Sequence, residues 1–184
     1  MRALLLSVPP GMLEERRRLG VDGRDEMWDG VVHVVPPAGD AQQALQPELL
    51  YVLFPLARRA GLLQRVETGL YGDERDYRVP DQLYCRPEHR SDRGAEGAEL
   101  VIEIRSIGDE TYEKIDWYAM LDVREMLIVH PEGRRVELLR NVGGRLLPLS
   151  ASPDGALHSE VLGITLATVD EQLVITWDGG SARI

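Results

Sequence analysis

Leu100-Val101-Ile102-Glu103-Ile104-Arg105 is the most informative segment for the fold, because it is apolar at nearly every position before its charged end. Such a run is typical of a strand that is buried on both faces of a sheet. A helix is predicted over residues 109–121, with acidic residues in its first turn that suit the helix dipole. The next strand is predicted over residues 125–129, and this order implies a parallel, right-handed crossover. The sequence therefore predicts an α/β protein.

Hydrophobic periodicity and turn residues predict the elements around this unit. The expected helices and strand regions are residues 12–19, 26–35, 41–60, 63–69, 77–85 and 134–149. Asp29-Gly30 is a hairpin-turn signal within the second of these regions, and Asn141-Val142-Gly143-Gly144 marks a second hairpin in the last. Residues 162–174 have a mixed pattern. The prediction is a central mixed β-sheet flanked by helices, with an added β-hairpin.

Length and composition favour one domain over residues 1–184, because 184 residues with 43% hydrophobic side chains can bury a core without cross-links. Cys85 is the only cysteine, which excludes an internal disulfide and fits a reducing compartment. The first ten residues lack the long apolar run of a signal peptide or a membrane span. We therefore expect a soluble, cytoplasmic protein that does not associate with membranes.

Charge limits the kinds of partner. The formal net charge is −10, so passive adhesion to nucleic acid is not expected, and any nucleic-acid contact must be local. Of 21 basic side chains, 20 are arginine and one is Lys114. A chain with this bias would place arginine wherever only positive charge is needed, so the single lysine invites a chemical explanation.

Two carboxylates point to a metal site. Glu103 lies inside a predicted buried strand, and Asp81 follows Val79-Pro80. A buried carboxylate is costly unless it is paired, protonated or bound to a metal. Two carboxylates ~4 Å apart repel by about 4 kcal/mol at an effective dielectric of ~20, and a divalent cation removes that repulsion. Two carboxylates with an open coordination sphere suit Mg²⁺ or Mn²⁺, and phosphodiester hydrolysis is the natural reaction.

Each of these residues also has a simpler interpretation. Asp81 can be a turn residue after Pro80, and Glu103 can form a structural ion pair with Arg105 or another arginine. Lys114 can orient or deprotonate a water or stabilise the phosphorane, but it can equally form an i,i+4 surface pair with Glu110. Arg105 is expected either to contact a phosphate or to clamp Glu103.

Motifs along the chain resemble the Uma-type family of restriction-endonuclease-like proteins in the PD-(D/E)xK superfamily. They are Glu26-x-x-Asp29-Gly30, Pro36-Pro37, Pro80-Asp81, Glu103-Ile104-Arg105-Ser106, Asp109-Glu110-x-x-Glu113-Lys114, Tyr118 and Val123-Arg124-Glu125. The resemblance covers a core of about residues 24–166 and implies a restriction-endonuclease-like fold.

The resemblance also implies site roles, with Asp81 and Glu103 as metal ligands and Lys114 as the lysine that has moved to the following helix. Arg105 then occupies the position that lysine holds in the parent motif. Glu26 is either a third, outer acid of the site or a charge at a strand end. Gln42 stands where the family tends to carry a histidine.

The leading hypothesis is a Mg²⁺- or Mn²⁺-dependent nuclease that cuts DNA, with Asp81, Glu103, Lys114 and Arg105 as its catalytic residues. One alternative is an inactive nuclease-fold protein that acts as an interaction or nucleic-acid-binding module. Another is a hydrolase of a small phosphate ester, which a narrow pocket over the two acids would favour. Nucleases of this fold often work as dimers, so a homodimer is a further expectation.

Overall fold

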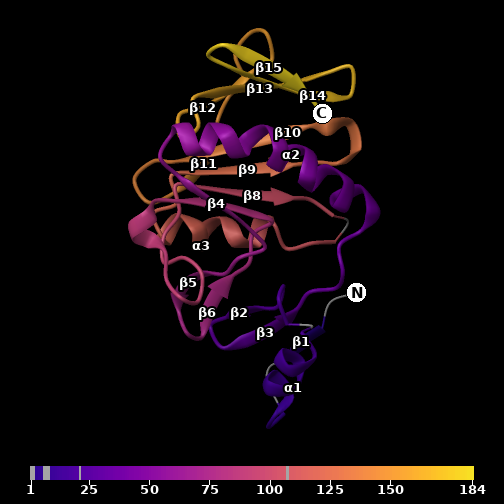
Figure 1. Cartoon of the computed structure of the whole chain (residues 1–184), viewed down its shortest axis with the longest axis vertical. Coiled ribbons are helices and arrows are strands. Elements are labelled where there is room, and N and C mark those ends of the chain that lie inside the picture. Colours follow the sequence, from indigo (N-terminus) through magenta and orange to yellow (C-terminus); the bar gives the residue numbers. More distant parts are fainter. Residues whose placement is uncertain (1–2, 6–8, 21, 107) are drawn as a thin grey trace.

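The structure, a computed structural model, describes residues 3–5, 9–20, 22–106 and 108–184. It contains a five-stranded, a six-stranded and a four-stranded sheet, which we call the N-terminal, central and C-terminal sheets. Figure 1 shows them stacked along the long axis of the molecule, with the central sheet in the middle. The mixed α/β class expected from the sequence is confirmed.

The central sheet has the strand order β11-β10-β9-β8-β7-β4. Its strands are β4 (Leu63–Val66), β7 (Gln82–Cys85), β8 (Leu100–Ile104), β9 (Glu125–Val129), β10 (Val136–Asn141) and β11 (Leu146–Pro148). The pair β8–β9 is parallel, with Leu100 opposite Glu125, while the other strand pairs of this sheet are antiparallel. The predicted strand–helix–strand crossover and the added hairpin β10–β11 are therefore confirmed.

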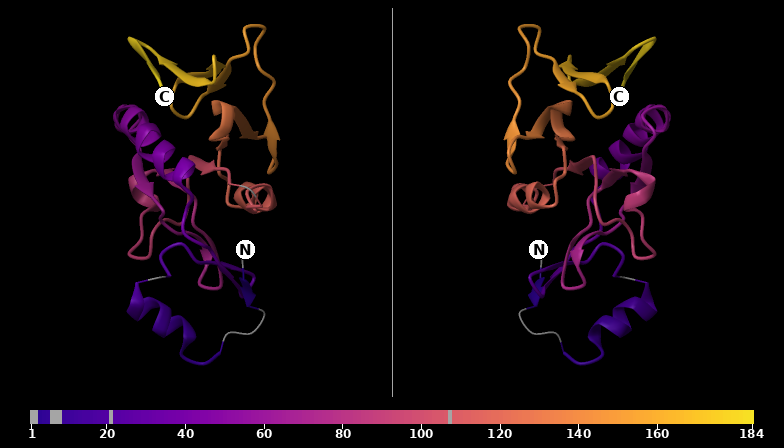
Figure 2. Two further views of the ribbon diagram at one scale, coloured as in Figure 1. Left: turned by 90° about the vertical axis from the view of Figure 1, so that its right-hand side faces the viewer. Right: turned by 90° about the vertical axis from the view of Figure 1, so that its left-hand side faces the viewer.

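Helices cover both faces of the central sheet. Figure 2 shows α2 (Asp40–Arg59) on one side of the sheet and α3 (Ile115–Met120) on the other. Strand residues alternate between the two: Ile102 packs in the core that contains α2, and Val101 packs in the core that contains α3. Glu103 shares its face with Val101, so its side chain is directed to the side of α3.

The N-terminal sheet has the order β1-β3-β2-β6-β5. Its strands are β1 (Ala3–Leu5), β2 (Glu26–Trp28), β3 (Val31–Val34), β5 (Leu70–Asp73) and β6 (Asp76–Arg78), and the short helix α1 (Met12–Leu19) lies between β1 and β2. Asp29 and Gly30 both have positive φ, 49° and 83°, as a two-residue hairpin turn requires. The predicted hairpin over residues 26–35 is confirmed.

Two expected elements are wrong in their extent. The single strand over residues 77–85 is broken at Val79-Pro80-Asp81, and its halves β6 and β7 belong to different sheets. Proline cannot donate to a strand ladder, which favours a break there. The helix expected from residue 109 begins only with the 3-10 turn η2 (Tyr112–Lys114), which leads into α3. Short 3-10 turns of this kind also occur at η1 (Pro87–His89) and η3 (Glu132–Arg134).

The mixed tail of the sequence forms the C-terminal sheet, which the sequence did not predict. Its strands β12 (Leu157–Ser159), β13 (Ile164–Val169), β14 (Gln172–Trp177) and β15 (Gly180–Arg183) pair in order and antiparallel. Leu166 and Ile175 of this sheet pack in the same core as the inner side of α2. Among the described helices, none is long and apolar enough to span a membrane.

Candidate active site

A cleft of about 460 Å³ opens where the end of β8 meets the N-terminal sheet. Its charged lining side chains are Arg24, Glu26, Asp81, Glu103, Asp109, Glu110 and Lys114. Five of these are acidic and two are basic, so the cleft carries an excess of negative charge. Three of the residues expected at the site, Asp81, Glu103 and Lys114, share this cleft, and Glu26 joins them.

Glu103 reaches the cleft from the central strand β8 and is 5% exposed. Its Oε1 accepts hydrogen bonds from Lys114 Nζ at 3.1 Å and from Tyr118 Oη at 2.6 Å. Within the described residues, no hydrogen bond reaches Oε2. The expected ion pair with Arg105 is not what neutralises Glu103, because its cationic partner is Lys114.

Asp81 lies in the break between β6 and β7, and its side chain is tied to the end of β8. Its Oδ2 accepts the backbone N–H of Ile104 at 2.7 Å, the residue next to Glu103. Its Oδ1 accepts Gln42 Nε2 at 2.6 Å and Arg24 Nη2 at 3.0 Å. Burial raises the pKa of Asp81, and the hydrogen bond from Ile104 and the charge of Arg24 only partly oppose this. Gln42, at the position of the family's histidine, therefore belongs to the site.

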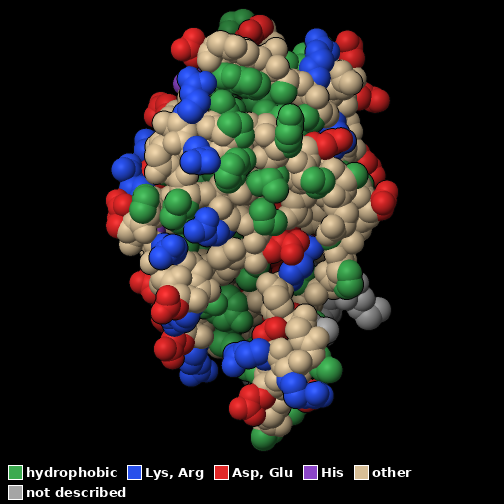
Figure 3. Space-filling model, viewed as in Figure 1, with side chains coloured by type: hydrophobic (Ala, Val, Ile, Leu, Met, Phe, Trp, Pro, Cys, Tyr) green, Lys and Arg blue, Asp and Glu red, His purple; other side chains and the backbone are tan. Residues whose placement is uncertain are grey.

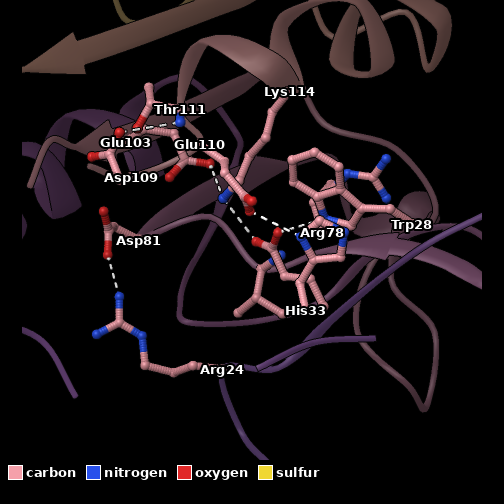
Figure 4. A network of polar contacts seen from close by, with 12 residues as sticks. Arg24, Trp28, His33, Arg78, Asp81, Glu103, Asp109, Glu110, Thr111 and Lys114 are labelled. Carbon is pink, nitrogen blue, oxygen red and sulfur yellow. Dashed lines mark hydrogen bonds and ion pairs between the residues drawn. The ribbon is translucent and has the colours of Figure 1, made fainter. Parts of the chain in front are cut away.

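Lys114 is buried between two carboxylates. Its Nζ lies 2.7 Å from Glu26 Oε1 and 3.1 Å from Glu103 Oε1 (Figure 4). The interpretation as an exposed i,i+4 helix pair with Glu110 is wrong, because Lys114 is 5% exposed and residue 110 precedes the helix. The lysine that the bias toward arginine singled out therefore lies in the same cleft as Asp81 and Glu103.

Glu26 is an inner member of the site and not an outer acid. It is 2% exposed on β2, and its Oε1 also accepts the backbone N–H of Val79 at 2.9 Å. Its Oε2 accepts Trp28 Nε1 at 2.8 Å. These contacts join the N-terminal hairpin to the break that carries Asp81.

The charges of the site shift several pKa values. Burial, reinforced by the charges of Asp81 and Glu26, raises the pKa of Glu103 to about 7. Burial acts to lower the pKa of Lys114, but the charges of Glu103 and Glu26 outweigh it and raise that pKa. Burial also acts to raise the pKa of Glu26, but Lys114 and the hydrogen bonds to the carboxylate lower it overall. Lys114 is therefore held as a cation.

A stack of rings and one guanidinium holds the N-terminal hairpin against α3. The Arg78 guanidinium lies 4.3 Å from the Trp28 ring centre and 4.4 Å from that of Trp117. His33 stacks on the other side of Trp28 at 4.1 Å, and its Nδ1 lies 2.9 Å from Glu110 Oε2 (Figure 4). The stack thus connects the strand of Glu26 with the helix that follows Lys114.

Arg105 lies just outside the carboxylate cluster. Its Nε is 3.4 Å from Asp109 Oδ1, and its guanidinium lies 4.7 Å from the centre of the Tyr112 ring. It lines a second cleft of about 310 Å³, which also contains His130 and Arg135 and shares Gln42 with the first. Among the described residues, the Arg135 side chain has no ion-pair or hydrogen-bond partner.

The donor set fits a hard divalent cation. Asp81 and Glu103 offer carboxylate oxygens in one cleft, Glu103 Oε2 is without a hydrogen bond from the described residues, and negative charge is in excess. Among the described residues, no group of three or more histidine, cysteine, aspartate and glutamate side chains is arranged to hold a metal. Mg²⁺ and Mn²⁺ keep several water ligands and bind through one or two carboxylates, so a two-carboxylate set is sufficient.

A mixed sheet with helices on both faces, and an acidic cleft with a buried lysine at the end of its central strand, define a restriction-endonuclease-like protein. The family model described as "Putative restriction endonuclease", Uma2, matches residues 13–169. The chain belongs to this Uma2 family.

The fold is similar to that of solved structures. One of them is the crystal structure of a "putative nuclease" from Anabaena variabilis ATCC 29413, which is 16% identical to this chain and superposes with a TM-score of 0.60. The match covers 75% of this chain and 82% of the other. No curated protein matches the chain.

Proposed function

We propose that the protein is a cytoplasmic nuclease that hydrolyses DNA phosphodiester bonds with Mg²⁺ or Mn²⁺ held by Asp81 and Glu103. The observation that carries this proposal is that these two carboxylates and the only lysine of the chain share one cleft. Membership of a family of restriction endonuclease type agrees with it. The net charge of −10 requires any contact with nucleic acid to be local, and Arg105 and Arg135 of the second cleft are proposed to supply it.

When bound, the cation neutralises the carboxylates, lowers the pKa of water at the site and screens charge on the phosphate. The residues of the chain supply orientation and hydrogen bonds. Tyr118 and Ile104 fix the two carboxylates through one hydrogen bond each, and Gln42 adds a second to Asp81. Because its pKa is raised, Lys114 is suited to donate hydrogen bonds to a phosphate oxygen or the attacking water, and not to remove a proton.

Arg105 and Arg135 in the adjacent cleft are proposed to bind a phosphate next to the one that is cut. Arg105 is held by Asp109 and Tyr112, and its pKa is raised, so it stays a cation. An arginine guanidinium suits a phosphate because it can donate two parallel hydrogen bonds. This explains how a chain of net charge −10 can still approach DNA.

The direct test is cleavage of single- and double-stranded DNA in Mg²⁺, in Mn²⁺ and in EDTA. We expect cutting in either metal and none in EDTA. A crystal grown with Mn²⁺ should show the ion within about 2.0–2.2 Å of oxygens of Asp81 and Glu103. Absence of both cleavage and bound Mn²⁺ would support the inactive interaction module instead.

One observation favours a second candidate, the hydrolase of a small phosphate ester. The cleft of about 460 Å³ has the size of an ordinary small-ligand pocket. A chromogenic phosphodiester and DNA should therefore be compared at equal protein and metal concentrations. Turnover of the small ester without any cutting of DNA would select the second candidate.

Metal affinity should depend on pH because a divalent cation must compete with protons for Glu103. With a pKa of about 7, this carboxyl is protonated below neutral pH and ionised above it. We expect the Kd for Mn²⁺ to rise about tenfold per unit as the pH falls from 7 to 5.5, and to change little above pH 8. Calorimetric titration measures this, and Asp109→Asn, in the same cleft, should keep the same profile. A Kd that is constant from pH 5.5 to 8 would contradict it.

Arg24 is expected to compete with the metal. Its guanidinium lies 3.0 Å from Asp81 and 3.4 Å from Glu67, and it is partly exposed. In Arg24→Gln, the Kd for Mn²⁺ at pH 8 should fall about threefold, because a partly exposed ion pair contributes less than about 1 kcal/mol and the metal no longer has to displace it. Arg86→Gln, which removes a partner of Glu99 instead, should leave the Kd unchanged. A weaker affinity in Arg24→Gln would show that Arg24 helps to orient Asp81.

A further inference from the structure

The outer face of α2 is apolar where a surface helix is normally polar. Tyr51 is 85% exposed and Phe54 is 44% exposed. They line a groove of about 940 Å³ together with Pro47, Pro55, Trp177 and Ala182, the last two from β14 and β15 of the C-terminal sheet. In the space-filling view, hydrophobic side chains form a patch over α2 and the C-terminal sheet (Figure 3). Large exposed patches of this kind mark interaction surfaces.

Charges are distributed unequally along this helix. Asp40 and Glu48 lie in its first half, while Arg58 and Arg59 form its end. Figure 3 shows acidic side chains more frequent on the right of the patch, where α2 begins, and basic ones on the left, where it ends. Glu48 and Arg58 are ten positions apart, or about 15 Å along the helix axis, which is about twice the screening distance of salt at about 0.15 M. The two charged regions therefore act separately on a partner.

A surface with an apolar centre, an acidic half and a basic half is complementary to itself under a two-fold rotation. We infer that the outer face of α2 is a homodimer interface in which two copies of α2 pack antiparallel. A two-fold axis between Tyr51 and Phe54 sets Tyr51 against Phe54 of the partner subunit. The same axis brings Glu48 close to Arg58 of the partner subunit, because positions 48, 51, 55 and 58 follow one face of a helix. A parallel arrangement would instead bring like charges together.

This inference is independent of the proposed nuclease activity. Tyr51 and Phe54 point outward, whereas Gln42 of the same helix points to the carboxylate cleft. The interface therefore leaves the cleft side of α2 uncovered.

The first test is the molar mass of the full chain, measured by light scattering and sedimentation from 1 to 100 µM. We expect a dimer of about twice 20.6 kDa. The double variant Tyr51→Ser/Phe54→Ser should raise the dimer Kd at least about a hundredfold, since buried aromatic anchors dominate interfaces. The matched control is Met120→Ser, which removes an apolar side chain 72% exposed on α3, and it should leave the dimer intact.

The second test is a charge reversal that reports on the direction of packing. Arg58→Glu should raise the dimer Kd about tenfold. Glu48→Arg should raise it by a similar factor, and it also removes the ion pair that Glu48 forms with Arg134 of its own chain at 3.3 Å. The combination of both should restore the Kd to within about threefold of the parent, because each new pair is again of opposite sign. Thermal unfolding confirms that each variant folds.

A monomer at every concentration overturns the inference, and so does a dimer that survives Tyr51→Ser/Phe54→Ser. A dimer that Met120→Ser disrupts overturns it as well. A double charge reversal that weakens the dimer further than either single change overturns the antiparallel arrangement.

Discussion

Asp81→Asn is expected to abolish metal-dependent DNA cleavage, lowering kcat/KM at least about a thousandfold, or roughly 4 kcal/mol of transition-state stabilisation. Asparagine keeps the size of the side chain and one oxygen that can still accept the Ile104 N–H, which aspartate binds at 2.7 Å. It removes the charge on which a divalent cation depends. The Gln42 amide, now at 2.6 Å from Asp81, can turn its own oxygen toward the new amide group.

The matched control for this variant is Glu99→Gln. Glu99 is a buried carboxylate immediately before β8, but its partners are Arg86 and Arg124, and none of the three lines the cleft. Cleavage is measured as the initial rate on plasmid DNA in Mg²⁺, and Mn²⁺ binding is measured in parallel. Glu99→Gln should cut within about twofold of the parent protein, in keeping with a change remote from the site. Cleavage that survives in both Asp81→Asn and Glu103→Gln would contradict the proposed mechanism.

The central unit of the fold could be predicted because its signal is local. A continuous apolar run such as residues 100–104 has few alternatives to a buried central strand, and the parallel pair with β9 follows from the chain order. The C-terminal sheet carried no comparable signal. Its strands are half-buried or at an edge, so apolar and polar residues mix, and the packing of Leu166 and Ile175 on α2 is a long-range contact.

The break between β6 and β7 shows where a sequence pattern is ambiguous. Residues 77–85 have strand composition throughout, and only Pro80 indicates an interruption. The interruption moves Asp81 out of the strand ladder and allows its side chain to accept the N–H of Ile104. The sequence made Asp81 a candidate, but its geometry depends on a turn that propensity alone did not reveal.

Glu26 could not be assigned because its role depends on contacts across the fold. It lies 88 positions from Lys114 in the sequence, yet the two side chains meet at 2.7 Å. What brings them together is the packing of Arg78 between Trp28 and Trp117 and the hydrogen bond to Val79. The sequence carries no local sign of this packing, nor of the contacts that Arg24 and Tyr118 make with the two acids.

Lys114→Met is expected to destabilise the protein by roughly 3–5 kcal/mol at pH 8, because it leaves buried carboxylates without their cation. Methionine has a similar length and fills the same space, so the loss of stability reflects the missing positive charge and not a cavity. Both Glu26 and Glu103 lose their nearest ion-pair partner, at 2.7 and 3.1 Å.

Arg140→Met is the control for this variant. Glu125 also loses an arginine, but it keeps hydrogen bonds from Ser159, Glu160 and Val161. The loss of stability in Arg140→Met should be no more than about 2 kcal/mol.

The pH dependence of the Lys114→Met loss identifies its cause. Without the lysine, the pKa of Glu103, already about 7, should rise further, and the pKa of Glu26, which Lys114 now lowers, should rise as well. A carboxyl whose folded pKa lies above its unfolded value of about 4.3 stays protonated in the folded state, so stability falls as the pH rises from the unfolded value to the folded one. Urea unfolding should therefore show a small deficit near pH 5 and the full deficit at pH 8. Adding Glu103→Gln should recover part of the deficit at pH 8, because one buried charge is then gone. An equal deficit at both pH values would mean that Lys114 acts through packing, and the buried ion pairs would then not be what holds the cleft together.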